Sequence, residues 1–154
     1  MRQSELYFRR ATVNDAGLLF RWINDSETRA QSLSTNYISY PKHMDWFSKK
    51  ILDSNCYLYI VYKDDVPVGM IRFDVQNDMC SVSYLVDKLQ RGKGIGSSIV
   101  YTGIQQFKND SSFTGLLTAV VKTVNHASLK IFEKFGFEKE TNDTGLVNFK
   151  KLIV

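Results

Sequence analysis

A glycine-rich turn in the second half of the chain carries the residues best suited to chemistry. Residues 91–96 read Arg-Gly-Lys-Gly-Ile-Gly and lead into an amphipathic stretch. Glycines allow a tight backbone turn and leave successive N–H groups unobstructed. A helix that begins there adds further free N–H groups and the positive end of its dipole. The turn therefore predicts a pyrophosphate site made mainly by backbone, with the charges of Arg91 and Lys93 at its rim.

Three kinds of phosphate-binding loop compete for this turn. A P-loop ends in Gly-Lys-Ser or Gly-Lys-Thr, which the chain lacks. A dinucleotide fingerprint follows the first strand of a βαβ unit, whereas this turn follows an expected antiparallel meander late in the chain. The third pattern is Gln/Arg-x-x-Gly-x-Gly/Ala, which Arg91, Gly94 and Gly96 match. A plain strand-to-helix turn is the remaining alternative.

Hydrophobic periodicity predicts the elements that position the turn. The order β-α-α-α-β-β-β-α-β-α-β-β predicts an α/β (α+β) fold with a mixed, mostly antiparallel sheet and helices on both faces. Asn14 or Asp15 is expected to cap the first helix, and Leu52 to end the buried stripe of the third. The expected strands are 6–10, 57–62, 67–74, 79–86, 116–121, 137–140 and 145–152. The expected helices lie near 15–23, 27–33, 41–52, 95–107 and 125–135.

Length and composition limit the class of protein. The 154 residues suit a single domain spanning 1–154, and 44% hydrophobic with 23% charged residues is typical of a folded, water-soluble chain. No apolar run approaches the roughly 20 residues that span a bilayer, and residues 1–5 lack the apolar core of a signal peptide. We therefore expect a cytoplasmic protein that has no membrane segment.

Charge and the number of cysteines and histidines limit the kinds of ligand and metal site that we expect. The net charge of +4 comes from basic residues scattered singly or in pairs, which favours a small polyanion over nucleic acid. The two cysteines, Cys56 and Cys80, lie in apolar surroundings and are expected to be buried thiols. Two histidines and two cysteines without ligand spacing predict no metal site.

Two motifs together resemble the GNAT superfamily of acyl-CoA-dependent N-acetyltransferases. The first is residues 82–87 (Val-Ser-Tyr-Leu-Val-Asp) leading into the glycine-rich turn. The second is Asn-His-Ala-Ser at 125–128 followed by Phe-Glu-Lys-Phe-Gly-Phe at 132–137. With the element order, the resemblance covers nearly the whole chain. It implies an enzyme that transfers acetyl from acetyl-CoA directly to a primary amine, without a metal.

The resemblance also implies which residues hold acetyl-CoA. Backbone groups at a splayed strand end pair with pantetheine, and the N–H of Leu85 donates to the developing oxyanion. Residues 92–97 hold the pyrophosphate, Asn125 bonds to the pantetheine arm, and Ser128 and Lys130 approach the nucleotide end. The cofactor set is Tyr84, Leu85, Val86, Arg91, Gly92, Lys93, Gly94, Ile95, Gly96, Ser97, Asn125, Ser128 and Lys130.

The chain departs from the family at the expected general acid. A tyrosine commonly protonates the departing sulfur in this superfamily, and the matching residue here is Phe132. Some relatives carry a glutamate base where this chain has Val120. Other candidates for acid–base work are His43 and Tyr84, which we include as catalytic candidates, and Glu27 and Asp74.

The N-terminal third resembles a subset of bacterial acetyltransferases that includes the enzyme acetylating a UDP-linked 4-amino sugar for pseudaminic acid. The resemblance predicts a small-molecule amine acceptor, a sugar nucleotide first, and leaves a homodimer open. Arginines are candidates for nucleotide phosphates and tryptophans for stacking on a base or sugar, although core positions for the tryptophans are the alternative. The candidate acceptor residues are Trp22, Asn24, Arg29, Trp46 and Arg72. A ribosomal-protein or peptide N-terminal acetyltransferase and a catalytically weak acyl-CoA-binding module remain alternatives.

Overall fold

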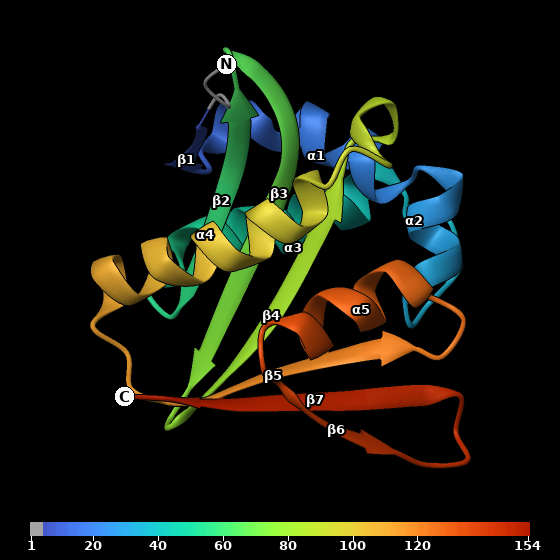
Figure 1. Cartoon of the computed structure of the whole chain (residues 1–154). Coiled ribbons are helices and arrows are strands. Elements are labelled where there is room, and N and C mark those ends of the chain that lie inside the picture. Colours follow the sequence, from blue (N-terminus) through green and yellow to red (C-terminus); the bar gives the residue numbers. More distant parts are fainter. Residues whose placement is uncertain (1–4) are drawn as a thin grey trace.

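The computed structural model describes residues 5–154, whose seven strands form one sheet with helices on both faces (Figure 1). The strand order is β1-β2-β3-β4-β5-β7-β6, and every neighbouring pair is antiparallel except β4 and β5. The expected element order and fold class are confirmed. The strands are β1 Leu6–Arg10, β2 Cys56–Lys63, β3 Val66–Gln76, β4 Met79–Val86, β5 Gly115–Lys122, β6 Glu138–Thr141 and β7 Leu146–Ile153. The helices are α1 Ala16–Ile23, α2 Ser26–Gln31, α3 Tyr40–Leu52, α4 Ile95–Ser111 and α5 His126–Lys134.

The first helix is entered through a short 3₁₀ turn, which the sequence did not predict. Thr12 caps that turn, and Asp15 returns a hydrogen bond to the Thr12 amide at 2.7 Å. Asp15 also forms an ion pair with Arg9 at 2.8 Å. Neither Asn14 nor Asp15 therefore caps α1 with its side chain, because that of Asp15 is occupied by Arg9 and Thr12.

Two further helix boundaries differ from expectation. Asp25 caps α2 by accepting from the Thr28 amide at 3.1 Å, so the helix is Ser26–Gln31 and not 27–33. In α3, His43 and Phe47 are buried, whereas Leu52 is 85% exposed. The buried stripe continues from Phe47 in steps of four residues, and Leu52 stands about 100° around the helix from that line.

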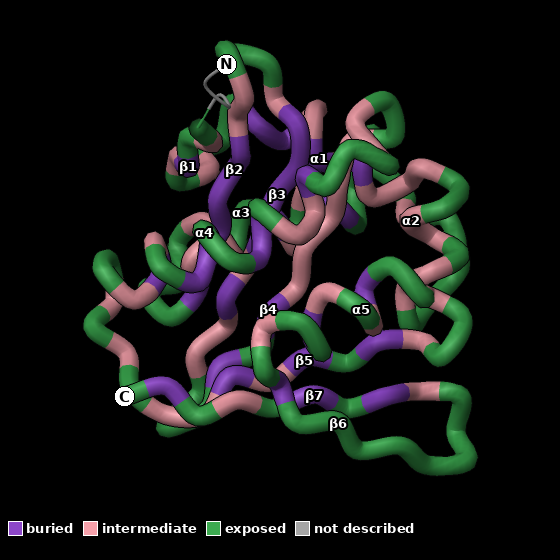
Figure 2. Tube along the Cα trace, viewed as in Figure 1, coloured by how far each residue is buried: buried purple, intermediate pink, exposed green. Residues whose placement is uncertain are grey.

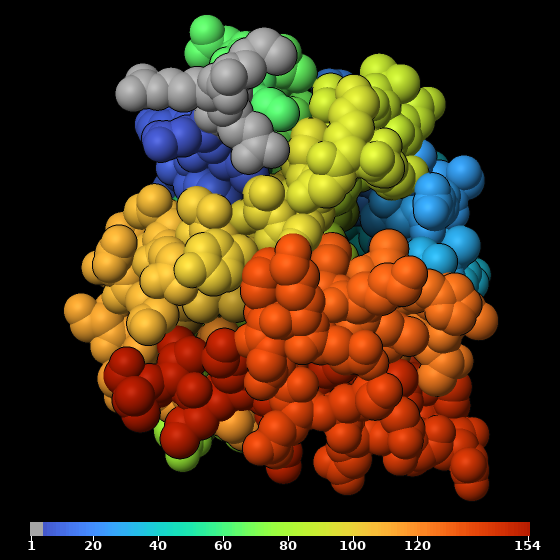
Figure 3. All heavy atoms as spheres, viewed as in Figure 1, coloured from blue at the N-terminus to red at the C-terminus, as the bar shows by residue number. Residues whose placement is uncertain are grey.

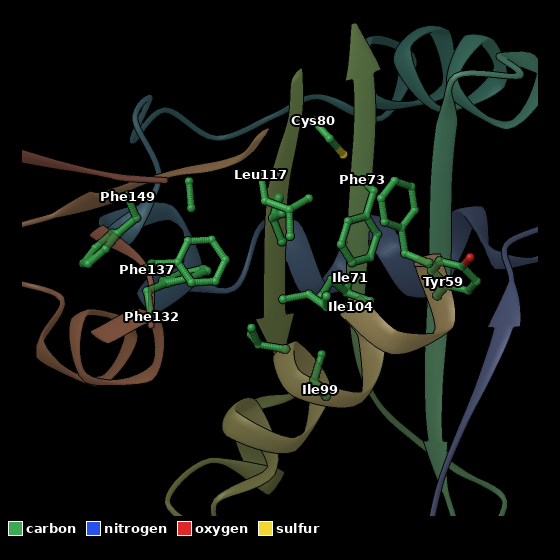
Figure 4. Close-up of a cluster of buried hydrophobic side chains, with 14 of the residues drawn as sticks. Tyr59, Ile71, Phe73, Cys80, Ile99, Ile104, Leu117, Phe132, Phe137 and Phe149 are labelled. Carbon is green, nitrogen blue, oxygen red and sulfur yellow. The ribbon is translucent and has the colours of Figure 1, made fainter. Parts of the chain in front are cut away.

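Two apolar clusters hold the helices on the sheet, and the central strands are the most buried part of the chain (Figure 2). The larger cluster joins the sheet to α4 and α5, with Phe73 stacked on Phe107 at 4.3 Å between ring centroids. Figure 4 shows its aromatic group around Phe132 beside Ile99 and Leu117. The smaller cluster joins the opposite face to α1 and α3. Cys80 lies in the first and Cys56 in the second, and both are buried free thiols as expected.

Candidate active site

The glycine-rich turn adopts the backbone conformation that an anion site requires. Gly92 and Gly94 have φ of +78° and +77°, and a Cβ built on either would meet nothing within 4 Å. Helix α4 begins immediately afterwards, and the Ser98 amide is bonded to the Gly94 carbonyl at 3.4 Å. The amides of residues 95–97 lie in the first turn, where α-helical geometry supplies no acceptor. The turn therefore presents backbone donors and the positive end of α4 to open space.

The third glycine of the turn is needed for packing. A Cβ on Gly96 would lie 3.3 Å from Ile131 of α5 and 3.4 Å from Val86 at the end of β4. The first turn of α4 is thereby pressed against both elements. Figure 3 shows the surface hollowed beside this turn, between α4, α2 and α5.

The cations near the turn are arranged differently from the expectation. Arg91 does not stand free at the rim, because its guanidinium is bonded to Asp25 at 2.7 Å and to Glu27 at 2.9 Å. Lys93 is exposed, and Lys134 of α5 lies 3.5 Å from the Ser97 hydroxyl. One lysine of the turn itself and one lysine of α5 thus lie near the backbone donors.

None of the described strands pairs with the edge of β4 next to the turn. β4 pairs with β3 along its whole length without a register shift. It pairs with β5 only at Met79, Cys80 and Ser81, after which the two strands diverge (Figure 1). Backbone groups on that edge beyond Ser81 are therefore available to a ligand.

Strand alternation decides which amides face the gap. The Asp87 amide donates to the Val68 carbonyl at 2.8 Å, on the β3 side. Neighbouring amides in a strand point to opposite edges, so the Leu85 amide also faces β3, whereas those of Tyr84 and Val86 face the gap. This corrects the expectation for Leu85: its N–H belongs to the β3 ladder, and its neighbours are the available donors.

Tyr84 connects the open edge to α5. Its hydroxyl lies 2.6 Å from that of Ser128, and its ring meets Phe132 edge-on at 6.1 Å between centroids. Burial raises the pKa of Tyr84, although the Ser128 contact opposes the shift, so the phenol is protonated at neutral pH. Asn125 caps α5 by accepting from the Ser128 amide at 3.3 Å.

Two expectations for α5 are refined. Ser128, expected with Lys130 near the nucleotide end of the cofactor, is buried against Tyr84, whereas Lys130 is exposed. Phe132, at the position of the family's tyrosine, is 2% exposed among Phe137 and Phe149. A hydroxyl at that position is absent, and the nearby phenol is that of Tyr84.

Comparison with protein families identifies the chain. The profile of the acetyltransferase (GNAT) family matches residues 19–137. The chain belongs to this family. It is accordingly an acyltransferase, and the open β4 edge and the glycine-rich turn lie within the matched region.

Individual relatives are distant. The chain is 25% identical over 122 residues to the acetyltransferase PseH of Campylobacter jejuni subsp. jejuni serotype O:2, covering 78% of this chain and 74% of that protein. A domain from Methanocaldococcus jannaschii has a similar structure, with a TM-score of 0.83, 21% identity and coverage of 98% and 100%. The spermidine N-acetyltransferase of Vibrio cholerae, in complex with CoA and spermine, has a TM-score of 0.85, 14% identity and coverage of 96% and 95%. The two structural similarities show that the same fold covers nearly the whole chain.

A pocket of about 270 Å³ lies on the side of the sheet that α1 and α3 cover, and most of it comes from the N-terminal third. Trp46 forms part of its wall with Arg72, whose guanidinium stands 5.1 Å from the indole centroid. Arg72 also donates to Asp74 at 2.7 Å. The lining residues are Ile23, Arg29, Ile38, Lys42, His43, Trp46 and Arg72.

His43 is a buried member of this pocket wall. Its Nε2 lies 3.0 Å from the Ala16 carbonyl, which accepts hydrogen bonds only, so Nε2 carries the proton. Within residues 5–154, Nδ1 is buried and has no hydrogen-bond partner. Burial lowers the pKa of His43, although the Ala16 contact opposes the shift, and the ring is neutral at pH 7. The unpartnered Nδ1 is thus a hydrogen-bond acceptor.

The side chains of three of the expected acceptor-binding residues are engaged in hydrogen bonds within the protein. Trp22 is 6% exposed and donates to Asp87 at 2.8 Å, so it leaves no ring face for stacking and takes the core position weighed as its alternative. Asn24 exchanges two hydrogen bonds with the backbone of Ile38, at 2.8 and 2.9 Å. Arg29 lines the pocket, but its donors are bonded to backbone carbonyls and to the Ser32 hydroxyl, the shortest contact being 2.6 Å to the Ile23 carbonyl. Of the five, Trp46 and Arg72 best fit direct contact with a ligand.

The remaining base candidates are poorly suited. Burial alone would raise the pKa of Asp74, but Arg72 and Lys50 hold it below its usual value, and Lys50 is 2.8 Å away. Glu27 is largely exposed and bonded to Arg91. Val120 has no ionisable group. His43 therefore remains the base candidate within the pocket.

Sequence reasoning missed several residues that organise the site. Asp87 and Asp25 fix the segments beside the turn, and Ile38 and Lys42 complete the pocket. Only Asp25 had a readable signal, because an aspartate before a short helix is a common N-cap.

Two further observations concern the part of the chain that the structure describes. Across residues 5–154, no three His, Cys, Asp or Glu side chains are grouped so as to hold a metal ion. None of the helices in the same range has the length and hydropathy needed to cross a membrane.

Proposed function

We propose that the protein transfers an acetyl group from acetyl-CoA to a primary amine of a small molecule, a UDP-linked 4-amino sugar being the first candidate. One observation carries the donor half: a backbone anion site at residues 92–97 adjoins the unpaired edge of β4. A phosphate-bearing end and an amide-bearing arm can bind there side by side. Coenzyme A has both, and the Vibrio cholerae relative was solved with CoA bound.

The residues fit a direct transfer. Tyr84 and Val86 direct their backbone amides to the gap, where pantetheine carbonyls and the thioester oxygen would accept hydrogen bonds from them. The amine nitrogen attacks the thioester carbonyl, so that a C–N bond forms and the C–S bond breaks. The amine loses a proton and the leaving sulfur gains one. The protonated Tyr84 phenol is the candidate donor to sulfur, in place of the hydroxyl missing at Phe132.

His43 is the candidate acceptor for the amine proton, directly or through one water. Its neutral ring and unpartnered Nδ1 suit that role, and its pocket adjoins the face opposite α4. Because Nδ1 is buried, the role requires the pocket wall to open over the ring when the acceptor binds. The lowered pKa makes it a weak base. Sugar amines flanked by electron-withdrawing oxygens are less basic than lysine, so a weak base is sufficient.

The pocket supports a small, partly anionic acceptor. Trp46 offers an apolar surface for a sugar, and Arg72 and Lys42 offer positive charge for phosphates. The likeness to PseH over 122 residues agrees with an amino-sugar acceptor. A pocket of about 270 Å³ suits a monosaccharide-sized group better than an extended peptide.

Thiol release from acetyl-CoA, followed over a panel of acceptors, tests the proposal. The panel holds UDP-4-amino sugars, aminoglycosides, polyamines and peptides with free N-termini. We expect turnover with a UDP-amino sugar and an acetylated product by mass spectrometry. Turnover confined to peptides would favour N-terminal acetylation instead. Binding of acetyl-CoA without turnover of any acceptor would favour a silent binding module.

A further inference from the structure

The turn that precedes α4 is fastened to α2 by a single arginine. The two terminal nitrogens of Arg91 reach Asp25 at 2.7 Å, Thr28 at 3.1 Å and Glu27 at 2.9 Å. The side chains of Arg91 and Asp25 are only 27% and 17% exposed, whereas that of Glu27 is 64% exposed. The Arg91–Asp25 pair is therefore the better shielded part of the contact.

Asp25 is also the N-cap residue of α2. Its Oδ2 accepts from the Thr28 amide at 3.1 Å as the helix N-cap. Burial alone would raise the pKa of Asp25, but the bonds from Arg91 and Thr28 hold it below its usual value. One carboxylate thus joins the start of α2 to the glycine-rich turn. A second link, from Trp22 to Asp87 at 2.8 Å, fastens the segment just before the same turn to α1.

Helix α2 in turn shapes the acceptor pocket. Arg29 of α2 donates to the carbonyls of Ile23 at 2.6 Å and Ser34 at 3.0 Å, on either side of the helix. Arg29 and Ile23 line the pocket, together with Ile38. A continuous set of polar contacts therefore leads from the turn through α2 to the pocket wall.

We propose that the Arg91–Asp25 pair couples the two substrate sites, so that binding of coenzyme A at residues 92–97 orders α2 and the Arg29 wall of the acceptor pocket. This inference rests on the proposed function, because it takes coenzyme A as the ligand of the turn. Arg91 and Asp25 are positioning residues in this scheme. By linkage, an acceptor held against the Arg29 wall strengthens coenzyme A binding by the same factor.

The variant Asp25→Asn separates this coupling from simple electrostatics. Asparagine keeps the shape and remains a good N-cap, so α2 keeps its start. It removes a negative charge near a phosphate site, which by Coulomb's law alone would strengthen binding of an anion. The proposed coupling predicts the opposite change in affinity. Without the charged link to Arg91 the turn is held less firmly in place, so we expect CoA to bind at least about fivefold more weakly.

The experiment combines two measurements on the full chain. Calorimetry gives the affinity for CoA, and hydrogen exchange reports the amides of residues 26–31 with and without CoA. In the wild-type protein we expect CoA to slow exchange in α2. In Asp25→Asn and in Arg91→Lys we expect weaker CoA binding and loss of that protection, even when CoA is raised to saturation.

A matched control removes the same charge elsewhere. Asp45→Asn breaks an exposed pair with Lys49 on α3, and it is expected to change neither measurement. Tighter CoA binding in Asp25→Asn, or α2 protection that persists at saturation, would overturn the coupling while leaving the proposed function intact. Failure of the wild-type protein to bind CoA would instead remove the proposed function.

Discussion

Acid–base roles in this site are decided by burial and partners more than by residue type. Tyr84 was a candidate for general base, yet its raised pKa and its contact with Ser128 suit a proton donor. Asp74 is a carboxylate on a strand, yet two cations neutralise it. The contacts of Ser128 with Tyr84 and of Lys50 with Asp74 were not readable from the sequence, because they join elements 44 and 24 residues apart along the chain. Arg72 is two residues from Asp74 on the same strand.

The role of Tyr84 leads to a first prediction. Tyr84→Phe removes the hydroxyl but keeps the ring that packs on Phe132, so the fold is expected to persist. Loss of a general acid is expected to lower kcat by about 10²-fold and leave the KM for acetyl-CoA nearly unchanged. Steady-state kinetics measure both constants.

Ser128→Ala is the control for that variant. It removes the partner of the phenol but not the proton donor, so its kcat is expected to fall much less. Equal losses in the two variants would show that the hydrogen bond, and not proton transfer, matters.

His43 leads to a prediction about pH. Its folded pKa lies below the ordinary value of about 6.5, so the unfolded chain binds the proton more readily. The stabilisation by neutral His43 is present above pH 6.5 and is lost as the pH falls towards the folded pKa. Denaturation at pH 7 and pH 5 should show a loss of stability that His43→Gln abolishes.

The second histidine supplies the control. His126, at the exposed start of α5, is the other of the chain's two histidines, so His126→Gln controls for replacing a histidine outside the pocket. The carboxylates with lowered pKa values titrate at lower pH and do not enter this window. An unchanged slope in His43→Gln would show that His43 is protonated as easily in the fold as outside it.

At the scale of elements, the sequence predicts type and order well and contacts poorly. Periodicity located most strands and α-helices, because most of them bury one stripe or face. The exceptions are β6 and α2, which contain no buried residue. It missed the 3₁₀ turn before α1, since a three-residue turn has no period to detect. It also missed the links through Asp25 and Asp87, which depend on how α1 and α2 dock beside the turn.

The pairing of β3 with β4 leads to an element-scale prediction. Gly69 faces Val86, and a Cβ there would lie 2.4 Å from the Leu85 carbonyl oxygen and 2.7 Å from Ile99. Gly69→Ala must therefore displace β4 or α4, and we expect a loss of about 1–3 kcal/mol in the free energy of unfolding. Chemical denaturation measures it.

Gly17→Ala on α1 is the matched control. Its Cβ would meet only the Arg21 guanidinium, at 3.7 Å. Because alanine favours helix and restricts the unfolded chain, this variant is expected to be neutral or up to about 1 kcal/mol more stable. Equal stability of the two variants would mean that β3 and β4 accommodate the methyl group.

At the scale of the whole molecule, the feature that forms the proposed cofactor site is the sheet, whose two halves are joined only by the short pairing of β4 with β5. β4 and β5 are paired only from Met79 to Ser81, and beyond Ser81 their facing edges diverge. The sequence predicted both strands and the resemblance suggested a splayed end. The residue at which they part was not readable, because the apolar pattern of β4 continues past it.

This arrangement predicts that the ligand stabilises the whole fold. Coenzyme A in the gap would contact both halves of the sheet as well as α4. At about 100 times its dissociation constant it contributes about 2.7 kcal/mol, which for a chain of this size raises the thermal midpoint by about 5–10 °C. Pantetheine at the same concentration lacks the pyrophosphate and is expected to raise the midpoint much less. Calorimetric melting of the two mixtures makes the comparison.

Variants at Gly94 test whether the phosphates of CoA bind at the glycine-rich turn. Gly94→Glu places a carboxylate in the open space beside the backbone donors, so CoA should bind more than about tenfold more weakly and its effect on the midpoint should shrink. Gly94→Ala strains the same positive φ without adding charge, so it separates conformational strain from repulsion. If CoA raises the midpoints of both variants as much as that of the wild-type protein, the turn is not where the phosphates bind, and the gap in the sheet needs another occupant.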